Sequence, residues 1–300
     1  MKSIFTKTAH NFIAHRTPSE KILIPSHKRL LEKLHNFKGP FQLISDFDAT
    51  LTKFNVNGVR VSTISMLTKN VLNDEEYKKA KQLFEKYHPV EVDPKIGLEE
   101  KAELMTKWWE QEYAIISQAN FTKRHLESIV DITPIFLRHG VDKTVELLHK
   151  HSLDFSVVSG GIGNFIEQVM QKVVPNSVEI LSNFLEFDHT ETFKGFSKPT
   201  IHSLNKHEVF RHRQLQNNVL LIGDVPYDLL TVKDKQVNTL SIGFYNCQNT
   251  YDLETYKKHF DILVLNDGDF CVVEYIVSHL LGVSKPKKET LEELDKLING

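Results

Sequence analysis

Short apolar runs alternate with amphipathic stretches along most of this chain. Strands are predicted for the run that ends at Ile44 and for residues 155–163, 178–182, 218–223, 239–244 and 261–265. Helical spacing of apolar residues follows or precedes these runs, most clearly at 140–151 and 164–174. Strands that alternate with helices predict a mainly parallel sheet that is covered on both faces. We therefore predict an α/β fold, a Rossmann-like parallel sheet with helices on both faces.

The alternation is interrupted once, over residues 60–135, where the strand pattern disappears and helical spacing replaces it. Helices are predicted at 74–87, 98–117 and 121–130, the first with Asn73 or Asp74 as its N-cap and Glu76 near its start. The sequence thus predicts a catalytic core built from residues 1–58 and 136–300. Residues 59–135 are expected to form a helical cap domain inserted into that core.

Two smaller elements complete the predicted organisation. Residues 184–196 contain two aromatic-rich runs around a polar turn, which predicts a hairpin. In the tail, residues 286–300, four apolar side chains recur at helical spacing, which predicts a short amphipathic helix docked on the core. These side chains are Leu291, Leu294, Leu297 and Ile298.

The first apolar run leads directly into a pair of carboxylates. Residues 43–52 read LISDFDATLT, so Asp46 and Asp48 stand two apart, with Thr50 two further on. Alternate residues of an extended segment point the same way, and the carboxyl ends of parallel strands face ligand sites. Two neighbouring carboxylates repel unless a cation or a shared proton intervenes, and Mg²⁺ suits their hard oxygens. The alternative interpretation is a solvated Asp-rich turn.

Two later segments carry polar side chains at strand ends. Ser159 and Gly160 close the second apolar run before a predicted helix, where glycine permits close backbone approach and the helix start suits phosphate. Asp224 and Asp228 follow the run 218–223. Lys206 lies in the polar stretch between these two segments. Taken alone, the glycine-rich turn is compatible with a purely structural role and the lysine with a solvated surface position.

The order of these motifs resembles that of the haloacid dehalogenase superfamily of phosphotransferases. Its four motifs are matched in turn by Asp46 with Asp48, by Ser159, by Lys206, and by Asp224 with Asp228. Residues 20–280 further resemble the cytosolic 5'-nucleotidase III family, which includes pyrimidine and 7-methylguanosine phosphate-specific 5'-nucleotidases. The segments that carry this resemblance are SDFDATLTKF (45–54), EVDP (91–94), SGGIG (159–163), SNFLEF (182–187), KGF (194–196), NKH (205–207) and LIGDVPYD (221–228).

The resemblance implies a magnesium-dependent 5'-nucleotidase that hydrolyses nucleoside 5'-monophosphates through an aspartyl-phosphate intermediate. Asp46 is the expected nucleophile, and Asp48 the expected general acid and then base, with a pKa above that of Asp46. Asp46, Asp48 (through its backbone carbonyl) and Asp224 are the expected metal ligands. Asp228 is expected to ligate the metal or to orient a ligand.

The remaining site residues are expected to bind the substrate. Lys206, Ser159 and backbone N–H groups around Gly160 would neutralise the phosphoryl oxygens, as the resemblance implies. Thr50 would hold either the loop or the phosphate, and a simple turn role is equally compatible with its position. The predicted partner is thus a small nucleotide such as CMP, UMP or 7-methyl-GMP.

Selection of the base is expected to reside in the cap. The resemblance points to Glu91 as the base-contacting carboxylate, although a glutamate in an acidic loop before Pro94 is also compatible with simple solvation. Trp109 falls where the methylguanosine-type members carry tryptophan, so it could stack on a base, or it could pack in the core. Glu112 departs from the family, which has serine at this position.

Composition is that of an ordinary globular protein, with 40% hydrophobic and 25% charged residues. The net charge of −2 gives no electrostatic argument for nucleic acid as a partner. Cys247 and Cys271 are too few for a disulfide framework, which favours a reducing, cytoplasmic location. No apolar run has the ~20 residues that cross a bilayer, so no membrane partner is expected. Residues 1–19 are basic but lack an arginine-rich transit pattern, and we expect a monomer rather than an oligomer.

Two alternatives to the nucleotidase function follow from the same residues. A phosphatase of the same superfamily could act on another small phosphate ester. A non-catalytic nucleotide-binding protein could keep the fold, although such a protein has no physical need for clustered carboxylates. Both alternatives remain open on the sequence alone.

Overall fold

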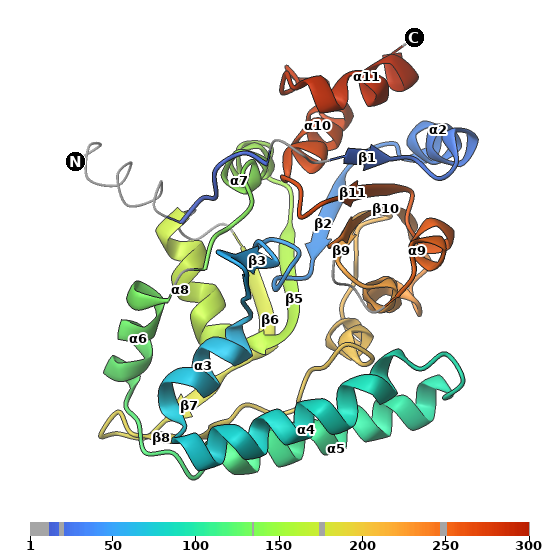
Figure 1. The fold of residues 1–300 in the computed structure, drawn as a ribbon. Helices are drawn as coiled ribbons and strands as arrows, with labels where there is room; N and C mark the ends of the chain where they lie inside the picture. The colour runs from blue at the N-terminus through green and yellow to red at the C-terminus, as the bar shows by residue number, and fades with distance from the viewer. Residues whose placement is uncertain (1–11, 18–20, 134, 174–177, 247–250, 300) are drawn as a thin grey trace, which may run out of the picture.

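The computed structural model describes residues 12–17, 21–133, 135–173, 178–246 and 251–299. Within them, seven strands form a sheet of order β1-β11-β10-β9-β2-β5-β6, in which only β1 runs antiparallel to its neighbour. The predicted, mainly parallel α/β sheet is therefore confirmed (Figure 1). Its strands are β1 Lys21–Leu23, β2 Phe41–Ser45, β5 Phe155–Ile162, β6 Glu179–Asn183, β9 Asn218–Gly223, β10 Asn238–Tyr245 and β11 Ile262–Leu265.

The central strands bury both of their faces. In β9, Leu220 and Ile222 belong to the largest apolar cluster, whereas Val219 and Leu221 belong to a second cluster. Because successive side chains of a strand point to opposite sides, the two clusters lie on opposite faces of the sheet. Burial on both faces explains why the sequence shows continuous apolar runs at these strands.

Helices cover the two faces unequally. Side chains of α7 and α10 join the larger cluster, and the short 3₁₀ helices η1 and η2 supply side chains to the smaller one. The core helices are α2 His27–Asn36, α7 Val141–Lys150, α8 Gly163–Val173, η1 Lys206–Phe210, η2 Pro226–Val232, α9 Leu253–His259, α10 Cys271–Leu280, η3 Glu289–Leu291 and α11 Glu292–Asn299. None of the helices in the described ranges combines the length and apolar character that crossing a membrane requires.

Between β2 and β5 the chain leaves the sheet and forms a largely helical segment. It contains the hairpin strands β3 Asn55–Val56 and β4 Val59–Arg60, followed by α3 Thr63–Val71, α4 Asp74–Val92, α5 Leu98–Ile116 and α6 Lys123–Ile132. Helices α4 and α5 lie side by side along one end of the molecule (Figure 1). At the start of α4, Asn73 and Glu76 form the reciprocal capping box that the sequence predicts.

Helix α4 differs from its predicted extent. The sequence analysis predicts an end at residue 87, yet α4 continues to Val92. It passes through Pro89, although proline lacks an N–H and crowds the preceding turn. Tertiary contacts hold this last turn: the Ser203 hydroxyl donates to the Glu91 carboxylate (2.5 Å), and the Tyr251 hydroxyl donates to the Glu91 carbonyl (3.3 Å). Glu91 therefore lies on a helix, and its expected position in a loop is wrong.

Two other predicted elements are confirmed, and several helices and strands were not predicted. The hairpin of β7 Leu185–Phe187 and β8 Phe193–Phe196 is present. The tail helix α11 docks through buried Leu294, and Leu291 at the end of the preceding η3 joins the same core cluster. Among the strands and α-helices, the sequence analysis missed β1, β3, β4, α2, α3, α9 and α10. The missed strands have only two or three residues, and α10 is buried on most of its surface, so it lacks an amphipathic pattern. Cys247 and most of the basic N-terminal segment lie outside the described residues.

Candidate functional site

The site is organised around one lysine that bridges two carboxylates. Asp46 directly follows β2, and its backbone N–H donates to the carbonyl of Ile222 in β9 (3.0 Å). Lys206, at the start of η1, donates from Nζ to Asp46 Oδ1 (2.6 Å) and to Asp228 Oδ1 (2.7 Å). All three side chains are buried. Although burial would lower the pKa of Lys206, Asp228 and Asp46 raise it above its ordinary value, so this lysine is charged.

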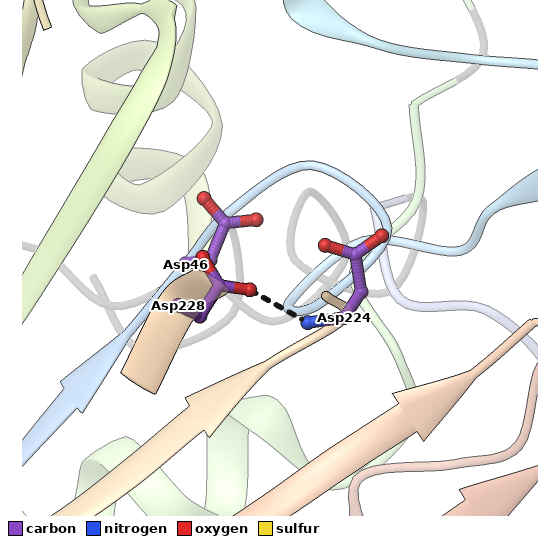
Figure 2. Close-up of side chains that lie close together, drawn as sticks. All are labelled: Asp46, Asp224 and Asp228. Atoms are coloured by element: carbon purple, nitrogen blue, oxygen red, sulfur yellow. Dashed lines mark hydrogen bonds between the residues drawn. The ribbon is translucent and has the colours of Figure 1, made fainter. Parts of the chain in front are cut away.

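Asp228 also fixes the loop that carries Asp224. Its Oδ2 accepts from the backbone N–H groups of Asp224 (3.0 Å) and Val225 (3.1 Å), and Figure 2 shows the first of these bonds. A Cβ on Gly223 would lie 2.4 Å from Asp228 Oδ2, so this close approach requires glycine. Both oxygens of Asp228 are thus committed to holding neighbouring groups.

Asp46, Asp224 and Asp228 form a compact acidic cluster (Figure 2). One oxygen from each carboxylate lies within 4.8 Å of the others. Burial raises the pKa of Asp46 to about 7, although Lys206 opposes the rise. Burial, together with the charges of Asp228 and Asp46, raises the pKa of Asp224 well above its ordinary value. In the ionised state these carboxylates would repel one another, and their oxygen donors suit a hard divalent cation, which would favour that state.

Asp48 faces the first turn of α3. The backbone N–H of Thr63 donates to Asp48 Oδ1 (2.9 Å), and the Thr63 hydroxyl donates to Oδ2 (2.7 Å). Thr63 Oγ1 also accepts from the N–H of Ile162, which ties α3 to the end of β5 (3.0 Å). Burial raises the pKa of Asp48, and the Thr63 hydrogen bonds oppose this rise. Because the pKa of Asp46 is also raised, the expected order of the two values stays a prediction.

Thr50 and the buried Arg138 make hydrogen bonds within the loop that follows β2. The Thr50 hydroxyl donates to Asp46 Oδ2 (3.2 Å). Arg138 donates from Nε to the Thr50 carbonyl (2.9 Å) and from Nη2 to the carbonyl of Ala49 (2.7 Å), a residue with a positive φ of 62°. Its Nη1 pairs with Asp267 Oδ1 at 2.8 Å. Arg138 thus holds the backbone of the loop that contains Ala49 and Thr50.

Ser159 and its two glycines form the neighbouring wall. Ser159 Oγ accepts from the N–H of Gly161 (3.0 Å) at the end of β5. A Cβ on Gly161 would lie 2.2 Å from Thr63 Oγ1 and 2.8 Å from Asp48 Oδ2. At Gly160 the nearest atoms are 3.4 Å away, an ordinary contact distance. The tightest approach in this motif therefore occurs at Gly161, one residue after the glycine that the sequence analysis selected.

A cavity of about 470 Å³ joins these groups to helices α4 and α5. Its core side is lined by Asp46, Asp48, Ser159, Gly160, Lys206, Asp224 and Asp228, and its helical side by Glu91, Trp108, Trp109 and Glu112, among others. The structure therefore brings all predicted site residues except Thr50 to the wall of one cavity, and Thr50 hydrogen-bonds to Asp46 just behind that wall.

The two tryptophans of α5 have different surroundings. The ring of Trp108 stacks on Tyr87 of α4, with centroids 6.0 Å apart and planes inclined by 10°. Trp109 instead packs against Tyr113 one turn further along α5, with a centroid distance of 5.4 Å. Both tryptophans are half-buried and both line the cavity. Each ring therefore has an aromatic neighbour within the helical segment, and both rings lie at the cavity wall.

Four residues that the sequence analysis did not select contribute to the site. Besides Thr63 and Arg138, Lys101 of α5 donates to the Tyr227 hydroxyl (2.8 Å), and Thr106 of the same helix contacts His202 Nε2 through its hydroxyl (3.1 Å). Burial lowers the pKa of His202 to about 4, so its ring is neutral. No local sequence pattern distinguishes these side chains, because each acts through a partner that is distant in the chain.

Comparison with known proteins places the chain in a family. A family model described as pyrimidine 5'-nucleotidase (UMPH-1) matches residues 49–281, well over half of the chain. The chain belongs to this family. The 7-methylguanosine phosphate-specific 5'-nucleotidase of Gallus gallus is 33% identical over 255 residues, which cover 80% of this chain and 88% of that protein. The putative cytosolic 5'-nucleotidase 3 of Caenorhabditis elegans is 31% identical over 281 residues, which cover 86% of this chain and 75% of that protein.

Solved structures agree on the fold. Cytosolic 5'-nucleotidase IIIB bound to cytidine superposes with a TM-score of 0.74 at 24% identity, covering 87% of this chain and 94% of that one. A substrate-bound phosphoserine phosphatase superposes with a TM-score of 0.52 at 15% identity, covering 82% and 100%. These likenesses confirm the haloacid dehalogenase-like fold. Family membership makes the chain a phosphoric monoester hydrolase and argues against the non-catalytic alternative.

The two adjacent glycines give a matched test of the packing around Asp48. Gly161→Ala places a methyl group against Thr63 and Asp48, so we expect it to lower the free energy of unfolding by about 1–3 kcal/mol and to reduce hydrolysis of p-nitrophenyl phosphate sharply. Gly160→Ala meets only the backbone of Ile201 and His202, at ordinary distances of 3.4 Å or more, and should change stability by less than about 1 kcal/mol. Urea unfolding and initial rates measure both effects. Equal effects of the two substitutions would contradict this account.

Arg138→Met tests the support beneath the loop. The substitution removes hydrogen bonds to two loop carbonyls and leaves Asp267 without its buried cation, so we expect the free energy of unfolding to fall by about 3–5 kcal/mol. Arg213→Met is the control, because the Arg213–Glu179 pair is about half exposed and should contribute less than about 1 kcal/mol. Urea unfolding curves of both variants decide the matter, and a loss at Arg138 no larger than that at Arg213 would refute the role.

Proposed function

We propose that this chain is a magnesium-dependent 5'-nucleotidase that converts pyrimidine or 7-methylguanosine 5'-monophosphates to nucleoside and phosphate. The observation that carries the proposal is the single cavity that connects the acidic cluster to an aromatic and carboxylate-lined helical wall. Relatives of the chain are named for 7-methylguanosine phosphate, and the superposed IIIB structure holds cytidine. A relative is also named cytosolic, which supports a cytoplasmic location.

Asp46 is the proposed nucleophile and Asp48 its acid–base partner. An oxygen of Asp46 would attack phosphorus and form an acyl phosphate, while the bond from phosphorus to the nucleoside O5' breaks. Asp48 would donate its proton to the leaving oxygen and then take a proton from the water that hydrolyses the acyl phosphate. The two hydrogen bonds from Thr63 keep the Asp48 carboxyl in one orientation. Burial, which raises the pKa of Asp48, favours the protonated form that the first step needs.

Asp46, Asp224 and the backbone carbonyl of Asp48 would hold Mg²⁺. When bound, the ion would neutralise the cluster and the phosphoryl oxygens, a role that suits its preference for hard oxygen ligands. Asp228 fits better as an orienting residue, because both of its oxygens already accept hydrogen bonds from Lys206 or the backbone of the Asp224 loop.

The phosphoryl group would sit between Lys206 and the Ser159 turn. Lys206 reaches Asp46 directly, so its ammonium lies beside any phosphorus that Asp46 attacks. Ser159 and the backbone around Gly160 and Gly161 line the same cavity wall. A fixed cation and preoriented donors stabilise the charge that develops in phosphoryl transfer.

Residues 59–135 are the proposed cap, which would hold the base. Glu91 lies on the helical side of the cavity, with its carboxylate oriented by the Ser203 hydroxyl from the core. Trp109 offers an aromatic surface at the same wall. A carboxylate can accept from the amino groups of cytosine or guanine, and an aromatic ring can stack on either base.

The proposed function is tested by a substrate panel with magnesium. We expect the protein to hydrolyse CMP and 7-methyl-GMP and to act poorly on phosphoserine and AMP. EDTA should stop the reaction, Mg²⁺ should restore it, and Asp46→Asn should leave less than a few per cent of kcat, because an amide is a poor nucleophile. The exposed Asp234→Asn serves as the control. Preference for phosphoserine, or activity that survives both EDTA and Asp46→Asn, would reject the proposal.

Glu91→Ala tests recognition of the base. Loss of one charged hydrogen bond of about 1.5–3 kcal/mol should lower kcat/KM for CMP and 7-methyl-GMP by roughly 10- to 100-fold. Hydrolysis of p-nitrophenyl phosphate, which has no base, should change far less. Glu85→Ala, an exposed glutamate of the same helix, is the control. Equal losses on nucleotide and aryl substrates would mean that Glu91 supports the helix or the metal site and does not read the base.

A further inference from the structure

A second carboxyl, that of Glu112, lies on the helical side of the cavity. Glu112 belongs to α5, its side chain is only 7% exposed, and it lines the cavity together with Glu91 and Trp109. Its Oε2 is buried and has no hydrogen-bond partner in the described ranges of the chain. Buried carboxyl oxygens are almost always paired, so an unpaired one requires an explanation.

The surroundings of Glu112 favour a missing ligand group. Burial alone raises the pKa of this carboxyl to about 7, since no neighbouring cation opposes the rise. Leaving a polar group in such a place costs stability unless a partner arrives. The terminal torsion of a glutamate has broad, roughly two-fold wells, so either oxygen can turn toward a bound molecule. A cation or an N–H donor that entered the cavity would satisfy Glu112 and favour its ionised form.

The position of Glu112 assigns it to the base end of the cavity. It lies four residues after Trp108 and three after Trp109, so its side chain lies one turn further along α5, next to both tryptophans, and all three line the cavity. Glu91 projects from the neighbouring helix α4 onto the same cavity. The phosphate-binding groups, by contrast, lie on core elements at the opposite wall. A nucleotide whose phosphate meets Asp46 would thus present its base to α4 and α5.

We propose that Glu112 contacts the base of the bound nucleotide and selects a base that carries a positive charge, such as 7-methylguanine. The proposal rests on the proposed nucleotidase function and names the residue that would set its selectivity. Two carboxyls and two electron-rich indole rings line the same cavity, and each of these groups can attract a cation more than a neutral base. The competing account is that Glu112 is a protonated packing residue without any role in selection.

The test compares two nucleotides that differ by one methyl group and one positive charge, 7-methyl-GMP and GMP. Glu112→Gln keeps the size of the side chain and removes its ability to ionise. We expect this variant to lower kcat/KM for 7-methyl-GMP by about tenfold or more, mainly through KM, and to leave GMP and p-nitrophenyl phosphate within about twofold. Glu110→Gln, an exposed glutamate of the same helix, should change none of the three. The ratio of kcat/KM for 7-methyl-GMP to kcat/KM for GMP is measured on one protein sample. A partial loss of folded protein lowers both values equally and leaves their ratio unchanged.

Other outcomes overturn the inference. A wild-type protein that treats the two nucleotides alike, or a Glu112→Gln variant with an unchanged ratio, would establish the packing account. If the wild type hydrolyses p-nitrophenyl phosphate but no nucleotide, the proposed function fails instead. Binding of 7-methylguanosine against guanosine, followed by tryptophan fluorescence, then decides the role of Glu112 by itself: a preference lost in Glu112→Gln supports it, and the absence of any preference overturns it.

Discussion

The ion pairs of Lys206 with Asp46 and Asp228 are the interaction on which the site depends. Four carboxyls, including those of Asp48 and Asp224, converge at the wall of one cavity, and like charges so close together repel. The ammonium of Lys206 offsets part of this repulsion by bonding two of them at 2.6 and 2.7 Å. Burial, with the charges of neighbouring carboxylates, raises the pKa values of Asp46 and Asp224. A divalent cation held by these oxygens would favour their ionised forms, and for this reason the site suits such an ion.

The order of the strands in the sheet explains how these mutually repelling carboxyls are brought together. β2, β5 and β9 run parallel and are neighbours, so the loops that follow them meet at one edge. Side-chain hydrogen bonds to the backbone then hold those loops. Arg138 holds the backbone carbonyls of the first loop, and Asp228 holds the backbone N–H groups of the last one. Thr63 links the first loop to both α3 and β5.

The same contacts that complete the site also attach the helical segment to the core. Thr63 bonds Asp48, Glu91 accepts from Ser203, and Lys101 donates to Tyr227. Each contact joins a residue of the segment between β2 and β5 to a residue beside the cavity. A change in the position of this segment would therefore change the orientation of Asp48 and of the carboxyls on α4 and α5 together, which couples the base end of the cavity to its phosphate end.

The sequence by itself determined the α/β class, most of the long strands and helices, and the set of acidic, lysine and serine residues at strand ends. Those features depend on local periodicity and on motifs whose members are few residues apart, and both can be read along the chain. It could not determine that α4 passes through Pro89, because contacts from Ser203 and Tyr251 stabilise the last turn. Nor could it identify Thr63, Arg138 or the unpaired carboxyl of Glu112, whose surroundings arise only when distant segments pack together. The burial of a side chain and its hydrogen-bond partners are set by the tertiary structure. They decided which of the chain's many polar side chains belong to the site.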